Sequence, residues 1–100
     1  MGTVSVIEGH DAVHTIQVRG RVEADTSVSL RQALVTTMLH RQAAAVLVDL
    51  GDVTEMDPMA VGALSAAHDV ARDLRLAFTV RVAQSPIAGQ LATVDLPLSP

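Results

Sequence analysis

A near-continuous apolar run in the middle of the chain constrains the fold most. Residues 44–50 read Ala-Ala-Val-Leu-Val-Asp-Leu, with one charged side chain among them. Such a run is typical of a central parallel strand that is covered on both faces. It falls far short of the ~20 residues that a membrane span needs. The sequence therefore predicts a sheet built around this strand.

Short β-rich segments and amphipathic segments alternate on either side of this strand. Further strands are predicted at residues 3–8, 14–22 and 77–83, with an edge strand at 96–98. Helices are predicted at residues 27–41, 58–74 and 87–94, with Asp25-Thr26-Ser27, Asp57-Pro58 and Ser85-Pro86 as their start signals. This order predicts an α/β fold in a single domain over residues 1–100, with a mixed, mostly parallel sheet of four to five strands and three to four helices. The first two strands are predicted to form an antiparallel hairpin, and residues 95–100 are predicted to form a short, loose tail.

Composition excludes several classes of function. The net charge is −4, which argues against a protein that holds nucleic acid through its phosphates. A single Phe without Trp or Tyr leaves no stacking platform for bases, and the absence of Cys excludes disulfides and thiolate chemistry. No signal peptide or membrane span is visible, so a cytoplasmic protein without a cofactor is expected.

Four carboxylates, Asp49, Asp52, Glu55 and Asp57, cluster around the end of the central strand, where residues 51–56 are expected to form a loop. Such a cluster could hold Mg²⁺ at the edge of an open α/β sheet. No Gly-rich phosphate loop and no lysine accompany it. The favoured interpretation is therefore that Asp57 caps a helix, Asp49 bonds the adjacent backbone, and the other two are solvated, with no metal bound.

The histidines do not form a recognisable catalytic or metal site. His10 and His14 would lie about 13 Å apart in an extended hairpin, too far for one ion. His40 ends a helix, where a positive charge suits the dipole, and His68 is expected on a polar helix face. Because no nucleophile or metal-ligand motif is present either, the sequence does not indicate an enzyme.

Two segments, together with the order of the elements, resemble the STAS domain family. The segments are Val46-Leu47-Val48-Asp49-Leu50 and Met56-Asp57-Pro58-Met59-Ala60-Val61-Gly62-Ala63-Leu64. That family's hallmark is a strand ending in apolar-Asp-apolar, a short loop, and Asp-Ser-Ser/Thr-Gly-Leu-Gly at the start of a helix. Gly20-Arg21-Val22-Glu23 is similar to the family's turn after the second strand, and residues 81–86 match the strand that precedes the third helix. The resemblance covers essentially the whole chain and implies a STAS-like fold.

The resemblance also implies roles for the start of the second helix. Asp57 matches the capping Asp, Pro58 stands at the first Ser, and Met59 stands at the phosphorylated Ser or Thr. Ala60 takes the place of the first Gly, whereas Val61 and Gly62 keep the Leu-Gly character. Because the acceptor hydroxyl is absent, regulation by phosphorylation at the usual site is not expected. The nearest substitute hydroxyls are Thr54 and Ser65.

In similar proteins this surface docks on an ATP-binding, kinase-like anti-sigma factor and frees a sigma factor. The resemblance therefore implies a non-catalytic anti-sigma factor antagonist. The expected partner-binding residues are Asp52, Glu55, Asp57, Pro58, Met59, Ala60, Val61, Gly62 and Ser65. Met56, Met59 and Val61 would form an apolar patch there; the alternative for the two methionines is that they fill the core. Two alternatives are an accessory subunit of a lipid-transport ABC complex and a stand-alone domain that senses a small ligand such as a nucleotide. The lack of aromatic and basic residues near the loop speaks against the last.

Overall fold

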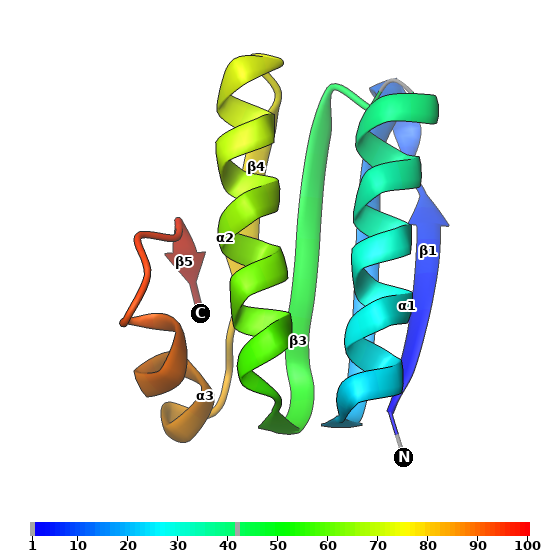
Figure 1. The fold of residues 1–100 in the computed structure, drawn as a ribbon. Coiled ribbons are helices and arrows are strands. Elements are labelled where there is room, and N and C mark those ends of the chain that lie inside the picture. Colours follow the sequence, from blue (N-terminus) through cyan, green and yellow to red (C-terminus); the bar gives the residue numbers. More distant parts are fainter. Residues whose placement is uncertain (1, 42) are drawn as a thin grey trace.

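A five-stranded mixed sheet forms one layer of the molecule, and helices form the other (Figure 1). The computed structural model describes residues 2–41 and 43–100. Along the chain the elements are β1 (Thr3–Glu8), the short 3-10 turn η1 (His10–Ala12), β2 (Val13–Val22), α1 (Ala24–Val35), the π-helical turn η2 (Thr36–His40), β3 (Ala45–Met56), α2 (Pro58–Asp73), β4 (Ala77–Arg81), α3 (Ser85–Leu91) and β5 (Leu98–Ser99). The strands lie in the order β1-β2-β3-β4-β5, with β1 antiparallel to β2 and the remaining pairs parallel. The predicted α/β fold with a mixed, mostly parallel sheet is confirmed.

The two long helices, α1 and α2, lie side by side against the same face of the sheet (Figure 1). Along β3, Val46 and Val48 are buried in the core, whereas Leu47 on the opposite face is only half-buried. Its neighbours in the register are Thr15 and Thr79, both half-buried. The prediction that the central strand is covered on both faces is therefore wrong. The described residues place the helices on one face alone.

β3 is longer than the sequence predicts, because residues 51–56 continue the strand instead of forming a loop. Its pairing with β2 shifts register twice, and each time β3 contributes one residue more than β2. Such β-bulges interrupt the alternation of faces. The buried positions in this stretch, Leu50, Val53 and Met56, are consequently three residues apart, a spacing that does not resemble a strand in the sequence.

The first and third helices begin at different residues from those predicted. α1 starts at Ala24, with Glu23 at the N-cap position and no side-chain cap bond, so Asp25 lies within the first turn. There its carboxylate accepts the backbone N–H of Thr26 at 2.8 Å and faces the positive end of the helix dipole. In α3, Gln84 and not Ser85 occupies the N-cap position.

The C-terminal residues belong to the sheet. Residues 95–100, predicted as a loose tail, contain β5, which pairs with Val80 and Arg81 of β4. The edge strand therefore lies at Leu98–Ser99, slightly later than predicted. The buried apolar side chains form one cluster between sheet and helices. Among the described residues, no helix is long and apolar enough to cross a membrane.

Candidate functional site

The start of α2 is fixed by the residue types predicted to fix it. Asp57 is the N-cap residue, and its Oδ1 accepts the backbone N–H of Met59 at 2.8 Å. Pro58 occupies the first turn, where its missing N–H leaves no unpaired donor. The backbone N–H of Asp57 donates to the carbonyl of Val22 at 2.8 Å. The ends of β2 and β3 therefore hold the helix start in place, and the predicted cap is confirmed.

Met59 is the exposed apolar side chain at this helix start. Its side chain is 60% exposed, whereas Met56 is 5% exposed and Val61 and Ala60 are buried. Met56 and Ala60 are thus core residues, and only a small part of the Val61 side chain reaches the surface. The predicted apolar patch of Met56, Met59 and Val61 is therefore wrong as a set, because two of its members face the interior. Of the three side chains, Met59 is the one that is largely exposed to solvent.

A hollow of about 410 Å³ lies between the first turns of α2 and the end of α3. Pro58, Val61 and Gly62 line it from α2, and Gln90, Thr93 and Val94 line it from the α3 side. The side-chain amide of Gln90 donates to the carbonyl of Met56 at 2.8 Å, which fixes α3 against the end of β3. Sequence reasoning missed this α3 wall, since no motif places Gln90 next to α2.

Gly62 is exposed and open. A Cβ built at this position meets no atom within 4 Å, so a side chain here would extend into solvent or into a bound partner. Ser65 follows on the same helix, but it is half-buried and not fully exposed as predicted. Of the expected contact residues on α2, Pro58, Met59 and Gly62 are therefore the accessible ones.

The acidic residues of β3 pair with arginines of neighbouring strands. Asp52 lies 3.6 Å from Nε of Arg19, and Glu55 lies 3.1 Å from Nε of Arg21, both pairs being well exposed. These residues are register partners across the parallel β2–β3 ladder. Within the described residues no three carboxylates or histidines come together as a metal site. The acids therefore form a rim of exposed ion pairs near the helix start, not a cluster of free charges.

This fold and site geometry can be compared with known proteins. The family profile described as "Mlab, STAS domain" matches residues 5–96. The chain belongs to the STAS domain family. No curated protein sequence matches it.

Solved structures share the fold at low sequence identity. The anti-sigma factor antagonist SpoIIAA in its unphosphorylated form superposes with a TM-score of 0.82 at 10% identity, covering 98% of this chain and 88% of that one. SpoIIAA of Bacillus in its phosphorylated form gives 0.79 at 11% identity, covering 97% and 89%. An anti-sigma factor antagonist from Mycobacterium paratuberculosis gives 0.73 at 24% identity, covering 100% and 86%. These likenesses establish the STAS fold of this chain.

The carboxylate of Asp49 is held by two hydrogen bonds on β3 and β4. Its Oδ1 accepts the backbone N–H of Gly51 and the Nη1 donor of Arg81, each at 2.9 Å. Burial on its own raises the pKa of Asp49, but these two bonds, the charge of Arg81 and the more distant charge of Arg19 outweigh it, so the pKa lies below its ordinary value. The predicted bond of Asp49 to the adjacent backbone is confirmed. Its role is structural, because it locks the first bulge of β3 to β4.

The histidines of the STAS domain are structural or exposed. His68 does not lie on a polar face as predicted: it is half-buried, its ring stacks on Phe78 with centroids 5.8 Å apart, and Nδ1 lies 3.0 Å from the carbonyl of Asp95. His14 is buried at the start of β2, while His10 and His40 are exposed. The described residues place none of them beside the start of α2 in a hydrogen bond or ion pair.

The two hydroxyls that the sequence singled out as substitutes for the family's phosphorylated residue differ in access. Thr54 is exposed on β3 and Ser65 is half-buried on α2. Met59 itself has no hydroxyl, and Pro58 has neither a hydroxyl nor a backbone donor. The site therefore presents an exposed apolar side chain, a hollow lined by the first turns of the same helix and a capped helix start.

Proposed function

We propose that this STAS domain is an anti-sigma factor antagonist, which binds an ATP-binding, kinase-like anti-sigma factor through the start of α2 and so frees a sigma factor. The observation that carries the proposal is Met59, which is 60% exposed in the first turn of α2. The first turns of the same helix line a hollow of about 410 Å³ through Pro58, Val61 and Gly62. An exposed methionine at a rigid helix start supplies an adaptable apolar anchor. The protein acts in the cytoplasm and needs neither catalysis nor a cofactor for this role.

The contact surface is defined by the accessible residues of the site. Pro58, Met59 and Gly62 supply the α2 side, and Thr93 and Val94 supply the opposite wall of the hollow. A side chain of the partner enters the hollow, while Met59 packs on the partner's surface. Because such interfaces concentrate their binding energy in a few buried anchors, Met59 carries a large share of the affinity.

The ion pairs of the rim tune this contact without supplying a strong net charge. Asp52 and Glu55 are each balanced by an arginine of β2, at 3.6 and 3.1 Å. Exposed pairs of this kind contribute about 0–1 kcal/mol each. They therefore set the orientation of the partner more than the affinity.

The absence of a hydroxyl at Met59 makes the docking site permanently competent. A phosphate on this first turn would bring about −1.5 to −2 charges into the contact surface, and docking would be opposed by repulsion or desolvation. Met59 cannot carry it. The activity of this domain is therefore controlled by its abundance or by a further partner, not by phosphorylation at this position.

The same feature favours a second candidate function. A permanently competent helix start also suits a subunit that stays docked, as in the alternative of an accessory subunit bound to the ATPase of a lipid-transport ABC complex. Both functions use Met59 and the hollow, so they differ in the partner and not in the surface.

The test is affinity capture from the native host with wild type, Gly62→Glu and Gly89→Glu. At both glycines a Cβ meets no atom within 4 Å, so both variants are expected to fold. Gly62→Glu places a charge in the proposed contact, whereas Gly89→Glu makes the same change on α3 outside the hollow. We expect an anti-sigma factor on wild type and Gly89→Glu, and at least ten-fold less on Gly62→Glu, the order of effect of losing one anchor contact.

The outcomes separate the functions. A transport ATPase with the same dependence on Gly62 selects the second candidate. An anti-sigma factor that Gly62→Glu and Met59→Glu retain as well as wild type shows that the start of α2 is not the docking site. Capture of neither class of protein overturns both functions.

A further inference from the structure

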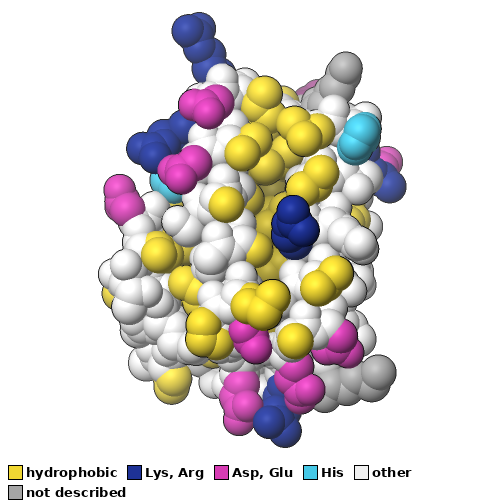
Figure 2. Space-filling model, in the orientation of Figure 1, with side chains coloured by type: hydrophobic (Ala, Val, Ile, Leu, Met, Phe, Trp, Pro, Cys, Tyr) yellow, Lys and Arg dark blue, Asp and Glu magenta, His cyan; other side chains and the backbone are white. Residues whose placement is uncertain are grey.

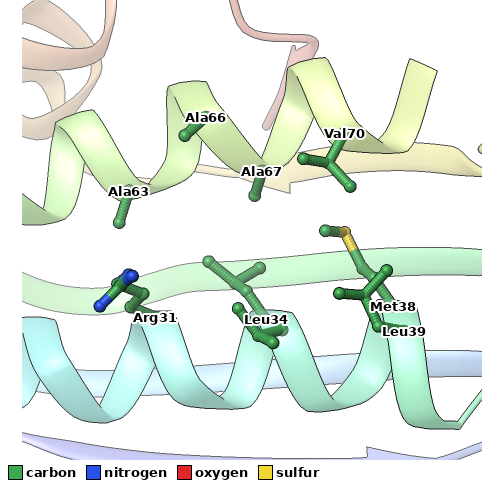
Figure 3. Close-up of a pocket in the computed structure, with 9 residues that line it drawn as sticks. Arg31, Leu34, Met38, Leu39, Ala63, Ala66, Ala67 and Val70 are labelled. Carbon is green, nitrogen blue, oxygen red and sulfur yellow. The ribbon is translucent and has the colours of Figure 1, made fainter. Parts of the chain in front are cut away.

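A second apolar hollow lies on the helical face, between α1 and α2. It has a volume of about 130 Å³ and is lined on the α1 side by Leu34, Val35 and Met38. On the α2 side it is lined by Ala63, Ala66, Ala67 and Val70 (Figure 3). The hollow exists because three alanines of α2 face longer side chains of α1. It shares no residue with the site at the start of α2.

Apolar side chains surround this hollow and are not covered by the chain. Leu39 is 51% exposed on the π-helical turn η2, and Val35 and Val70 are also exposed. Figure 2 shows hydrophobic side chains gathered along the furrow between the two helices, with a basic side chain among them. The turn η2 contributes to this arrangement, because it buries Met38 while Leu39 stays outside. Segments of π-helix occur often at functional sites.

Arg31 of α1 is the charged group of this furrow. Its side chain lies between the helices, near Ala63 (Figure 3). Arg19, Arg21, Arg41, Arg72 and Arg81 each form an ion pair with a carboxylate, whereas Arg75, which lies outside the furrow, forms none within the described part of the chain. Over the described residues Arg31 has no carboxylate within 4.0 Å. An exposed guanidinium in an apolar furrow is thus left with its donors available to an acidic partner.

We propose that the furrow between α1 and α2 binds an amphipathic helix of a partner protein, with a large apolar side chain seated in the hollow and a carboxylate paired with Arg31. The volume of the hollow, about 130 Å³, is close to that of the ~150 Å³ cavity that holds a benzene molecule, so the hollow admits one large apolar side chain. A further apolar residue on the partner helix, one or two turns away, contacts Leu39 and Val70. This is the helix-in-groove mode of recognition.

Charge distinguishes this occupant from a second copy of the chain. A symmetric dimer that packs the furrow on itself brings Arg31 of each copy toward the same interface. Like charges facing each other at the centre of an apolar contact are unfavourable. A partner helix with a carboxylate at the matching position satisfies the arginine instead. The inference stands independently of the proposed function, since it concerns a different surface.

The experiment uses the full chain and three versions of one labelled, side-chain-stapled peptide helix. The peptide carries Leu at i, i+4 and i+7, and Glu, Gln or Lys at i+3. Binding is measured by fluorescence anisotropy, and the contact is located by amide chemical-shift changes on α1 and α2. We expect the Glu peptide to bind about five-fold more tightly than the Gln peptide, the upper range for one exposed ion pair, and the Lys peptide to bind most weakly.

Variants of the protein test both parts of the proposal. Arg31→Glu should reverse the order of the Glu and Lys peptides, whereas Arg75→Glu, an equal charge change outside the furrow, should preserve it. Ala66→Phe fills the hollow from an exposed position of α2 and should abolish binding, while Ala92→Phe should not. Circular dichroism and thermal unfolding verify that each variant folds.

Contrary results would be decisive. Absence of binding by all three peptides, equal affinities among them, or an unchanged order with Arg31→Glu would overturn the proposal. A dimer of the free chain in sedimentation that Ala66→Phe dissociates would show that a second copy is the occupant, and would overturn it as well.

Discussion

Arg81 on β4 reaches across the open face of the sheet to Asp49 on β3, with Nη1 2.9 Å from Oδ1. The guanidinium occupies the space beside Gly51, where a Cβ would collide with it. The same carboxylate oxygen accepts the N–H of Gly51 at 2.9 Å. Because residue 51 is a glycine, the Arg81 guanidinium has room to lie beside the bulge of β3 and bond the Asp49 carboxylate.

The first prediction concerns the pH dependence of stability. Because the pKa of folded Asp49 lies below its ordinary value, the ionised carboxylate stabilises the fold above the unfolded pKa of about 3.9. This contribution is lost as the pH falls through the lower folded pKa. We expect wild type to be more stable than Asp49→Asn by up to about 1 kcal/mol near pH 7, since Arg81 is partly exposed, and the difference to shrink below about pH 4.

Urea unfolding between about pH 3 and pH 7 measures this difference. Asp52→Asn is the control for the loss of one negative charge, because its pair with Arg19 is long and exposed at 3.6 Å. A difference between wild type and Asp49→Asn that grows toward low pH would contradict the assignment, as would one that shows no pH dependence.

The second prediction compares two glycines. Gly62→Ala should raise the free energy of unfolding by about 0.5–1 kcal/mol, because alanine is favoured in a helix and its Cβ meets no atom within 4 Å. Gly51→Ala forces Arg81 away from Asp49, and the gain from removing a glycine is offset by the loss of that pair. Chemical unfolding of both variants checks the contrast. If Gly51→Ala stabilises as much as Gly62→Ala, the guanidinium does not need the space beside Gly51.

The order of the elements could be predicted from sequence because each carries a local signal. The Asp57-Pro58 start of α2 depends only on adjacent residues, and the structure confirms it. The extension of β3 through residues 51–56 could not be predicted, because the burial pattern of this stretch follows from two bulges in the pairing with β2. Pairs such as Arg19 with Asp52 depend on that register, which is set by tertiary packing and not by local sequence.

The candidate site was predictable only in part for the same reason. The cap and the exposure of Met59 follow from the position of one helix start. Whether Met56 faces the core depends on the second bulge of β3, which no local sequence signal predicts. Met56 was therefore predicted as part of the apolar surface patch. The hollow depends on where α3 packs, which is set by its buried Ile87 and Leu91 and by the long-range bond from Gln90 to the carbonyl of Met56. No local pattern encodes that contact.

The third prediction separates the two methionines. Met56→Ala removes a buried side chain and should cost about 2–5 kcal/mol of the free energy of unfolding. Met59→Ala removes an exposed one and should change it by about 0.5 kcal/mol or less. Urea unfolding of both variants provides the measurement. A large loss for Met59→Ala would show that this side chain is part of the core, and would remove the basis for its role as an anchor.

The last prediction concerns phosphorylation at the start of α2. Because Met59 has no hydroxyl, wild type incubated with its anti-sigma factor and ATP should gain no phosphate at residues 57–62. Met59→Ser restores an acceptor, and its phosphate would meet exposed N–H groups and the positive end of the helix dipole. The carboxylate of Asp57, which accepts the N–H of residue 59 at 2.8 Å, opposes the added charge. We therefore expect an adduct on Met59→Ser, slowed by that carboxylate and by the rigid Pro58, and none on Met59→Ala.

Intact mass and fragment spectra identify the modified residue, and a binding assay should show that the phosphorylated variant loses its partner. A stoichiometric adduct on wild type, at Thr54 or Ser65, would instead show that the domain keeps a switch by another hydroxyl, and permanent competence would be wrong.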